Sequence, residues 1–311
     1  MSFTDEVKNE IARRDFDDKC CRLAELAALV KINGSLRIDN QQLALKLESK
    51  NAAVARRIYR LLQEQFDFFT DIIVRKKMYL DKKNYYIIRV PPQPGVREIL
   101  VECGLITGKY QLNHQIKEEL IVQDCCARSY LRGVFLATGS VSNPDSEYHL
   151  ELTVNSKEYA VQLQKLCIKF EIDLRYRSKN GSYLLYLKKA YDIIKVMNLI
   201  GSDWAVLQFE NARVYKEVRN RVNRIVNCET ANLNKTVIAA QNHLEDIELI
   251  DSLQGLDKLP ASLQEIAALR RENPYSSLKE LGELLEPTLS KSGVNHRLRR
   301  IKKVADKLKK S

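Results

Sequence analysis

The residues with the clearest potential for chemistry are four cysteines in two adjacent pairs, Cys20–Cys21 and Cys125–Cys126. Thiolates are strong zinc ligands, and structural zinc sites hold the ion with four cysteine or histidine side chains. Neighbouring residues of a helix point roughly 100° apart, so one pair cannot easily clamp one ion. No Cys-x-x-Cys spacing occurs, and the four histidines are scattered. We therefore expect buried thiols at the start of two packed helices, with no metal and no cofactor.

A stronger chemical signal is the positive charge at the C-terminus. Between Ser290 and Ser311, nine lysines and arginines stand against one acid, Asp306, a net charge of +8 out of +11 for the chain. The other 289 residues carry only +3. Concentrated positive charge indicates a polyanionic partner, either nucleic acid or an anionic membrane. No catalytic pattern competes with this signal, because the sequence lacks a Gly-x-Ser-x-Gly turn and a phosphate-binding glycine loop.

The elements that must present this charge are three short predicted helices in residues 259–311. Capping boxes are predicted at Ser262 with Glu265 and at Ser277 with Glu280, and Ser290 is expected to cap the third helix. That helix would bury an apolar face made of Val294, Leu298, Ile301, Ala305 and Leu308. Two capped helices joined by a tight turn, the second one basic, are typical of a helix-turn-helix DNA-binding domain.

The third helix is then the predicted recognition helix, and its outward residues are candidate contacts to DNA. Residues placed toward base edges are Lys291, Ser292, Asn295, His296 and Arg299. Asparagine can read adenine and arginine can read guanine through paired hydrogen bonds. Phosphate contacts are expected from Arg297, Arg300, Lys302 and Lys303. The cap residues Ser277 and Ser290 are also predicted to belong to the DNA-binding surface. The alternative is a basic, solvated tail on a small helical bundle.

Residues 206–258 are predicted to be a helical linker. Val214, Val218, Val222 and Val226 recur every four residues as a narrow apolar stripe. Possible DNA contacts beside it are Arg219, Asn220, Asn223 and Arg224, although these side chains could equally form a solvated face. The run NCETANLNKT is expected to break this linker into two helices.

An internal repeat organises residues 1–205. The segments CCRLAELAALVKINGSL and CCARSYLRGVFLATGSV match at a constant offset of 105 residues, and the patterns that follow them also recur. Each copy, about 1–108 and 109–205, reads α-β-β-α-β-β-α. Small residues four apart in the first helices are expected to let those helices pack closely: Ala24 and Ala28, then Ser129, Gly133 and Ala137. The predicted fold class is α+β, a duplicated αββαββα domain followed by a helical linker and an all-α helix-turn-helix domain.

Paired helices that end in Gly-Ser and lead into ββαββα resemble the LAGLIDADG homing-endonuclease fold. More narrowly, the WhiA family of bacterial regulators is similar to this sequence in CCRLAELAALVKINGS, ENARVYKEVRNRVNRIVNCETANLNKT and SLKELGELL followed by SKSGVNHRLRRI. The resemblance covers nearly the whole chain. It implies binding to double-stranded DNA and transcription regulation linked to cell division, chromosome segregation and sporulation. Other transcription or cell-division proteins are further possible partners.

The same resemblance identifies two degenerate nuclease positions. A LAGLIDADG nuclease needs a carboxylate just before the glycine that ends each central helix, where the pair holds divalent metal. Here those residues are Asn33 and Thr138, and Glu25 lies too far back along its helix to replace them. We therefore expect no enzyme. The alternatives are a metal-dependent endonuclease and a scaffold that uses the duplicated domain to bind other proteins.

Basic residues also lie on predicted strands of the duplicated domain. The strand residues could touch phosphate or could guard exposed sheet edges: Arg75, Lys76, Lys77, Lys82, Lys83, Arg175 and Arg177.

With 45% hydrophobic and 29% charged residues, the composition is that of a soluble globular chain. No signal peptide or membrane span is recognisable, and an odd number of cysteines suggests thiols. We expect a cytoplasmic, nucleoid-associated protein of undetermined oligomeric state.

Overall fold

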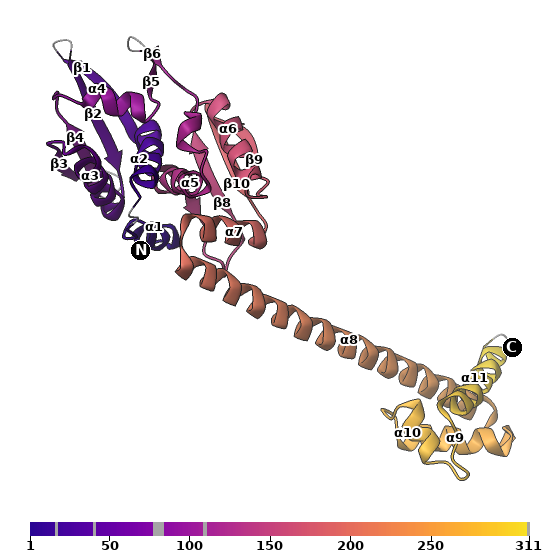
Figure 1. Cartoon of the computed structure of the whole chain (residues 1–311). Helices are drawn as coiled ribbons and strands as arrows, with labels where there is room; N and C mark the ends of the chain where they lie inside the picture. The colour runs from indigo at the N-terminus through magenta and orange to yellow at the C-terminus, as the bar shows by residue number, and fades with distance from the viewer. Residues whose placement is uncertain (16–17, 40–41, 77–83, 108–110, 310–311) are drawn as a thin grey trace. The chain divides into compact units, whose positions relative to one another are not determined.

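The computed structural model describes residues 1–15, 18–39, 42–76, 84–107 and 111–309 (Figure 1). Two compact units make up the chain, an N-terminal unit of Met1–Lys216 and a C-terminal unit of Glu217–Ser311. Each unit has a hydrophobic core of its own. No helix among the described residues is both long enough and apolar enough to span a membrane.

The N-terminal unit contains the two predicted copies in the predicted order. The first copy is α2 (Lys19–Asn33), β1 (Gly34–Asp39), β2 (Gln42–Ser49), α3 (Ala52–Phe66), β3 (Asp71–Lys76), β4 (Asn84–Val90) and α4 (Val96–Glu102). The second copy is α5 (Asp124–Thr138), β7 (Ser140–Val141), β8 (Leu150–Val154), α6 (Lys157–Ile168), β9 (Arg175–Lys179), β10 (Ser182–Leu187) and α7 (Ala190–Ile200). Their antiparallel sheets have matching strand orders, β1-β2-β4-β3 and β7-β8-β10-β9. The duplication and the α+β class are confirmed.

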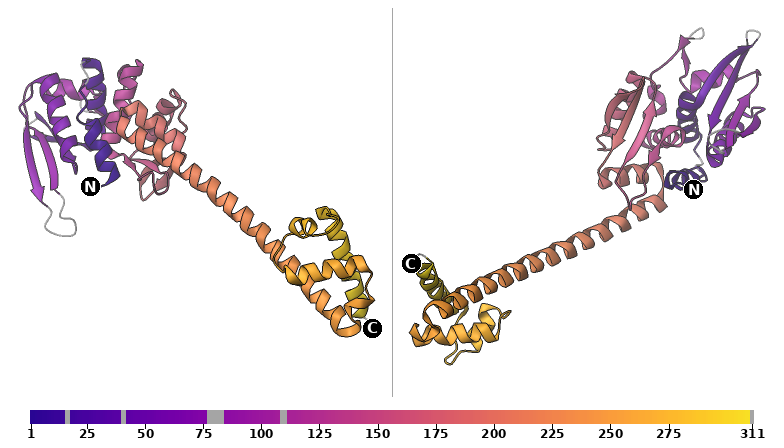
Figure 2. Two further views of the ribbon diagram at one scale, coloured as in Figure 1. Left: turned by 90° about the horizontal axis from the view of Figure 1, so that it is seen from below. Right: turned by 180° about the vertical axis from the view of Figure 1, so that it is seen from behind.

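The central helices α2 and α5 pack against each other along the middle of the N-terminal unit, as the views of Figure 2 show. Gly133 lies at the contact. A Cβ atom added there would come within 2.8 Å of the Ala28 Cβ and closer still to the Glu25 carbonyl oxygen. Only glycine allows this approach, so the expectation that small residues bring the two helices together is confirmed.

Four short elements were not part of the sequence prediction: α1 (Phe3–Ile11), β5 (Ile106–Thr107), β6 (Gln111–Leu112) and the 3-10 helix η1 (Glu118–Leu120). Helix α1 begins at a capping box, in which the Ser2 hydroxyl accepts from the Asp5 N–H and the Asp5 carboxylate accepts from the Ser2 N–H. It then buries Val7 and Ile11. A serine followed three residues later by an acid was the signal in the sequence that could have revealed this helix.

Helix α8 (Asp203–Gln254) begins in the N-terminal unit and ends in the C-terminal unit. The predicted break at Asn227–Thr236 is wrong, because the helix continues through these residues. The run contains neither proline nor glycine, and asparagine and threonine lower helix propensity by well under ~1 kcal/mol each. These residues therefore weaken the helix without ending it.

The C-terminal unit packs the end of α8 and a 3-10 turn, η2 (Leu256–Lys258), with three helices, α9 (Ala261–Glu272), α10 (Leu278–Glu283) and α11 (Lys291–Leu308). Its core joins Ile247 and Ile250 of α8 to Leu263, Ile266 and Leu298. The capping box predicted at Ser262 and Glu265 is wrong, since α9 begins at Ala261 and Pro260 is its N-cap. Proline suits a helix start because it has no backbone N–H group, and the N–H groups at a helix start have no partner within the helix.

Candidate nucleic-acid interface

Two side-chain caps fix the helices of the predicted interface. At the start of α10, the Glu280 carboxylate accepts from the Ser277 N–H at 2.7 Å, and the Ser277 hydroxyl accepts from the Glu280 N–H at 3.3 Å. The hydrogen bond from the Ser277 backbone lowers the pKa of Glu280. At the start of α11, the Ser290 hydroxyl accepts from the Gly293 N–H at 3.3 Å. The predicted capping roles of Ser277 and Ser290 are confirmed, and both act on the structure of the domain.

The turn between α10 and α11 is pressed against α10. The Leu289 N–H donates to the Gly282 carbonyl at 2.9 Å, and a Cβ atom at Gly282 would collide with the Leu289 carbonyl oxygen. Helix α11 then buries Val294, Leu298, Ile301 and Ala305. Because one face of α11 is held in the core, the opposite face is set by the helical repeat.

The opposite face of α11 carries nearly all of the predicted contact residues. Exposed side chains on it are Ser292, His296, Arg299, Arg300 and Lys303, while Lys291 and Lys302 are exposed at its flank, where Asn295 is partly exposed. Ser292, Asn295 and Arg299 follow one another at spacings of three and four residues, so they share one side of the helix. Such a row of two amide or hydroxyl side chains and one guanidinium can meet base edges, with lysines left for the flanking phosphates.

Arg297 differs from its predicted phosphate role. Its guanidinium donates to the Glu265 carboxylate at 2.9 Å and to the Ser262 carbonyl at 3.3 Å. Arg297 therefore ties α11 to α9, and the Glu265 charge offsets its own. The sequence could not reveal this contact, because the two residues meet only after the helices pack.

The predicted linker contacts lie on a part of α8 without tertiary packing. Residues 217–235 are all exposed, including Arg219, Asn220, Asn223 and Arg224. The apolar stripe beside them is uncovered too, with Val218 57% and Val222 50% exposed. These polar side chains and the valine stripe are therefore all accessible to a partner along this part of α8.

Basic residues of the duplicated domain lie on edge strands. Arg75 and Lys76 end β3, and Arg175 and Arg177 begin β9, all of them exposed. The Arg177 guanidinium lies over the Tyr186 ring at 5.9 Å. Both strands stand last in their sheets, where positive side chains suit phosphate contact and edge protection alike. Lys77, Lys82 and Lys83 lie outside the described residues.

The two degenerate nuclease positions come together at the C-terminal ends of α2 and α5. Asn33 and Thr138 line one cavity with Lys8 and Lys50, and with the acids Asp5 and Glu48. The Thr138 hydroxyl donates to the Thr153 carbonyl at 2.7 Å, and burial lowers the pKa of Lys8 to about 8. The helix ends thus present an amide and a hydroxyl, with an amine beside them. Among the described residues, acids here do not gather into a metal-holding group of three ligands.

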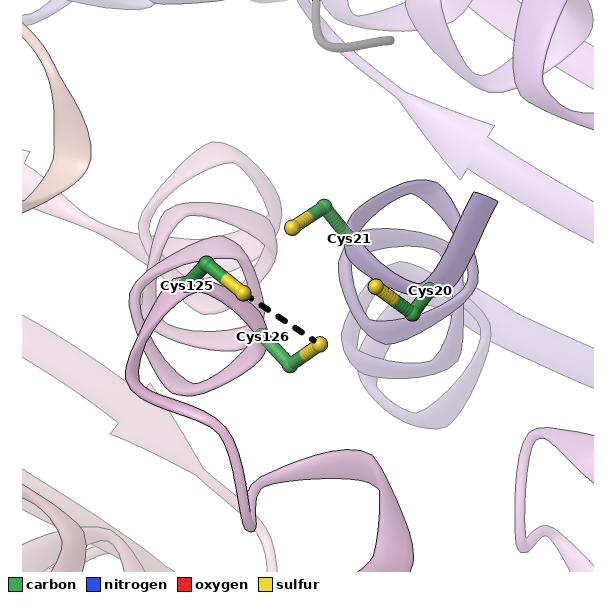
Figure 3. Close-up of side chains that lie close together, drawn as sticks. All are labelled: Cys20, Cys21, Cys125 and Cys126. Atoms are coloured by element: carbon green, nitrogen blue, oxygen red, sulfur yellow. Dashed lines mark hydrogen bonds between the residues drawn. The ribbon is translucent and has the colours of Figure 1, made fainter. Parts of the chain in front are cut away.

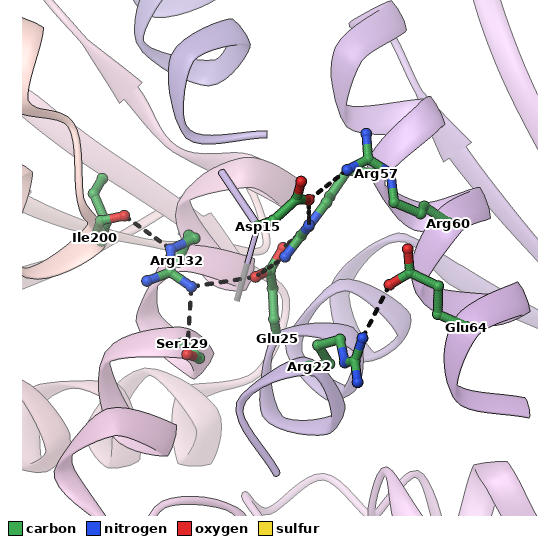
Figure 4. A network of polar contacts seen from close by, with 9 residues as sticks. All are labelled: Asp15, Arg22, Glu25, Arg57, Arg60, Glu64, Ser129, Arg132 and Ile200. Carbon is green, nitrogen blue, oxygen red and sulfur yellow. Dashed lines mark hydrogen bonds and ion pairs between the residues drawn. The ribbon is translucent and has the colours of Figure 1, made fainter. Parts of the chain in front are cut away.

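Glu25 is committed to a buried ion-pair network (Figure 4). Its carboxylate accepts from the Arg57 guanidinium at 2.8 and 3.1 Å and from Arg132 at 3.3 Å. Arg132 also donates to the Ile200 carbonyl at 2.9 Å. These contacts join four helices, α2, α3, α5 and α7. The Glu25 carboxylate is paired with two guanidinium groups and is therefore committed to the core.

The four paired cysteines lie closer together than the sequence suggested. Each pair starts one of the central helices, and the packing of α2 on α5 brings the pairs face to face (Figure 3). All four sulfur atoms lie within 4.8 Å of one another. The expectation of buried thiols holds for Cys21 and Cys126 but is wrong for Cys20 and Cys125, which are exposed at the helix starts.

A duplicated LAGLIDADG-like scaffold and a helix-turn-helix module in one chain define the class of protein. Three family models match it: the WhiA N-terminal LAGLIDADG-like domain over residues 19–106, the WhiA LAGLIDADG-like domain over 127–219, and the WhiA C-terminal HTH domain over 222–305. The chain belongs to the WhiA family.

Curated relatives and one solved structure match nearly the full length of the chain, and a second solved structure matches its N-terminal part. The protein from Desulforamulus reducens named "Probable cell division protein WhiA" is 48% identical and covers 99% of this chain and 97% of its own. The protein of that name from Halothermothrix orenii is 46% identical and covers 99% of both. The crystal structure of full-length WhiA from Thermatoga maritima matches with a TM-score of 0.63 at 26% identity over 99% of both chains. A crystal structure of a WhiA N-terminal LAGLIDADG domain shares the fold, with a TM-score of 0.53 at 24% identity over 65% of this chain and 91% of that one.

Proposed function

We propose that this chain is a sequence-specific double-stranded DNA-binding protein that regulates transcription and has no nuclease activity. The observation that carries the proposal is the exposed face of α11, on which Asn295 and Arg299 follow Ser292 along one side of a strongly basic helix. In a helix-turn-helix domain, this side of the second helix enters the major groove. Base edges would be read by Asn295, Arg299, Ser292, His296 and Lys291, and phosphates would meet Arg300, Lys302 and Lys303.

The biological setting is proposed from the family. Relatives at 46–48% identity are named as probable cell division proteins, which supports a role in cell division for this chain. A regulator of transcription that serves division and chromosome segregation would act on the nucleoid, where its DNA partner is. Further contacts to the duplex are proposed from Arg219, Asn220, Asn223 and Arg224 of α8.

The experiment that tests DNA recognition is selection of duplexes from a random pool by the full-length chain, followed by binding measurements. We expect an enriched sequence that binds far more tightly than a shuffled duplex of the same composition. Equal binding to both duplexes would contradict sequence-specific recognition.

Absence of nuclease activity is proposed because Asn33 and Thr138 cannot give negative charge to a hard cation. Incubation of the selected duplex with Mg²⁺ or Mn²⁺ should leave it intact. Specific cleavage that disappears with chelator would favour a metal-dependent endonuclease.

A second candidate function is a protein-binding platform in the duplicated domain. The uncovered apolar stripe of Val218, Val222 and Val226 on α8 favours a protein partner for the chain, although these residues are not part of the duplicated domain itself. If the full-length chain captured a division or transcription protein equally well with and without DNA, this function would stand beside regulation.

A further inference from the structure

The four thiols at the start of α2 and α5 form a compact group with equal contributions from the two copies. Cys20 and Cys21 are the second and third residues of α2, and Cys125 and Cys126 have the same places in α5. All sulfur atoms lie within 4.8 Å of one another, and those of Cys125 and Cys126 are 3.9 Å apart. The group is thus a four-sulfur cluster, as Figure 3 shows.

The spacing of the sulfurs suits a tetrahedral metal ion. A zinc ion with Zn–S bonds of about 2.3 Å holds its four sulfurs about 3.8 Å apart. The cluster therefore needs to contract by at most about 1 Å to close around such an ion. A disulfide, by contrast, requires two sulfurs at about 2.05 Å and leaves the other two without a role. We propose that Cys20, Cys21, Cys125 and Cys126 bind one Zn²⁺ ion.

The chemistry of the ligands selects the ion and the kind of site. Four soft sulfur ligands favour zinc over magnesium or calcium, which bind through oxygen. Four protein ligands leave no open position for water or substrate, so the site is structural and not catalytic. Cys20 and Cys125 are exposed, while Cys21 and Cys126 are buried, so the ion has a route from solvent to the buried pair.

Four thiolates around Zn²⁺ carry a net charge of −2, and the local backbone can offset part of it. Both helices begin at the cluster, and their N-caps, Asp18 and Gln123, make no side-chain cap hydrogen bond. The positive end of each helix dipole therefore lies at the cluster, while the Asp18 carboxylate adds negative charge near Cys125. The nearby acid Asp124 is neutralised in part by Lys169 at 2.7 Å.

Gln123 covers the cluster from the loop before α5. Its carboxamide oxygen accepts from the thiols of Cys20, Cys125 and Cys126 at 3.9, 3.6 and 3.9 Å. When the thiols lose their protons to a metal, rotation of the carboxamide presents its NH2 group to the thiolates. The same side chain thus serves the metal-free and the loaded cluster.

The consequence of the site is a clamp between the two copies. Each pair comes from a different copy, so the ion cross-links α2 to α5 at the ends opposite Asn33 and Thr138. Binding free energy at a structural zinc site adds to folding stability. Zinc loading should therefore raise the melting temperature of the N-terminal unit.

The test uses the full-length chain purified under reducing conditions, with metal content measured by mass spectrometry and with Co²⁺ titrated into the metal-free protein. We expect one zinc per chain and the visible absorption of a tetrahedral Co²⁺–thiolate site. Both should be lost in the Cys20→Ser/Cys125→Ser chain, whose two substitutions are exposed and leave the core intact. Cys228→Ser, at an exposed cysteine on α8 outside the cluster, is the matched control and should keep both.

Removal of zinc from the wild-type chain by chelator should lower the melting temperature, and the Cys20→Ser/Cys125→Ser chain should show no further drop. Three results would overturn the proposal: four titratable free thiols without bound metal, a disulfide within the cluster in the metal-free protein as isolated, or iron bound in place of zinc. Unchanged metal content in the double variant would also overturn it.

Discussion

Single side chains on α11 divide into those that face solvent and those that hold the domain together. Arg299 is exposed, whereas Arg297 is paired with Glu265 at 2.9 Å. Two arginines only two residues apart therefore have different roles. Their sequence positions alone could not separate them, because the difference depends on which side of the helix meets α9.

Arg299→Ala should weaken binding to the target duplex by about 1–3 kcal/mol, because a guanidinium that reads guanine loses both hydrogen bonds. Binding to an unrelated duplex should change little. Lys303→Ala is the matched control, since a phosphate contact is lost equally on every sequence. Fluorescence anisotropy on both duplexes measures these effects, and an equal loss on both for Arg299→Ala would refute its base-reading role.

Glu25→Gln should lower the free energy of unfolding by about 3–5 kcal/mol, because it leaves Arg57 and Arg132 buried with a neutral partner. The comparison is Glu64→Gln, which removes a partly exposed pair with Arg22 and should change stability by less than about 1 kcal/mol. Urea unfolding of the two variants gives both values. Similar values for the two would show that the buried network adds no more than a surface pair.

Lys8 gives the N-terminal unit a specific pH dependence. Burial lowers the pKa of Lys8 from 10.5 to about 8, so in this pH range the unfolded chain keeps a proton that the folded chain has released. The contribution of Lys8 to folding stability therefore rises as pH increases from about 8 to 10.5. Lys8→Met should remove this rise and should be the more stable chain at neutral pH.

Urea unfolding of the wild-type and Lys8→Met chains on both sides of this pH range tests the effect. The difference in unfolding free energy between the chains should shrink as the pH increases. A constant difference would mean that the amine has an ordinary pKa and does not titrate within the range.

Elements with a strong hydrophobic pattern could be predicted from the sequence. The two αββαββα copies, α10 and α11 follow from apolar periodicity together with caps, and these signals are local in the chain. Short or weakly marked features were missed or wrong: α1, the start of α9, and the continuous course of α8 through Asn227–Thr236. In each of these, polar residues were the main local signal, and packing or the absence of proline and glycine decided the result.

For the site residues too, features local to one helix could be predicted, whereas contacts between different elements could not. The lack of carboxylates at Asn33 and Thr138 and the outward row on α11 could be predicted, because both depend on position along one helix. The four-sulfur cluster, the Glu25 network and the Arg297–Glu265 pair join different elements. Such contacts depend on tertiary packing, which a single sequence does not specify residue by residue.

The contact of α2 with α5 depends on Gly133. Gly133→Ala should destabilise the N-terminal unit by about 1–3 kcal/mol, because the new methyl group would come within 2.8 Å of the Ala28 Cβ in a closely packed core. Helix propensity alone would act in the opposite direction by about 1 kcal/mol. The sign of the change in melting temperature therefore distinguishes the two effects, and an increase would contradict the close packing.

In the whole chain, positive charge is concentrated near the C-terminus. Residues 290–311 carry a net charge of +8 in a short segment, whereas the much longer duplicated domain, residues 1–205, carries +6 and residues 206–289 carry −3. The segment that contains the proposed recognition helix therefore has the highest density of positive charge in the chain. Binding of the chain to DNA should weaken as the salt concentration increases, because contacts to phosphates release counterions from the DNA.

The central claim is that the exposed face of α11 reads DNA sequence. Its most direct test is the ratio of affinities for a selected duplex and a shuffled duplex, measured with the full-length chain and with Asn295→Ala/Arg299→Ala at several salt concentrations. We predict a ratio of at least about 10³ for the wild-type chain. The double variant should keep salt-dependent binding to both duplexes but lose most of the ratio. A wild-type ratio near one, or a ratio that the double substitution leaves unchanged, would contradict the claim.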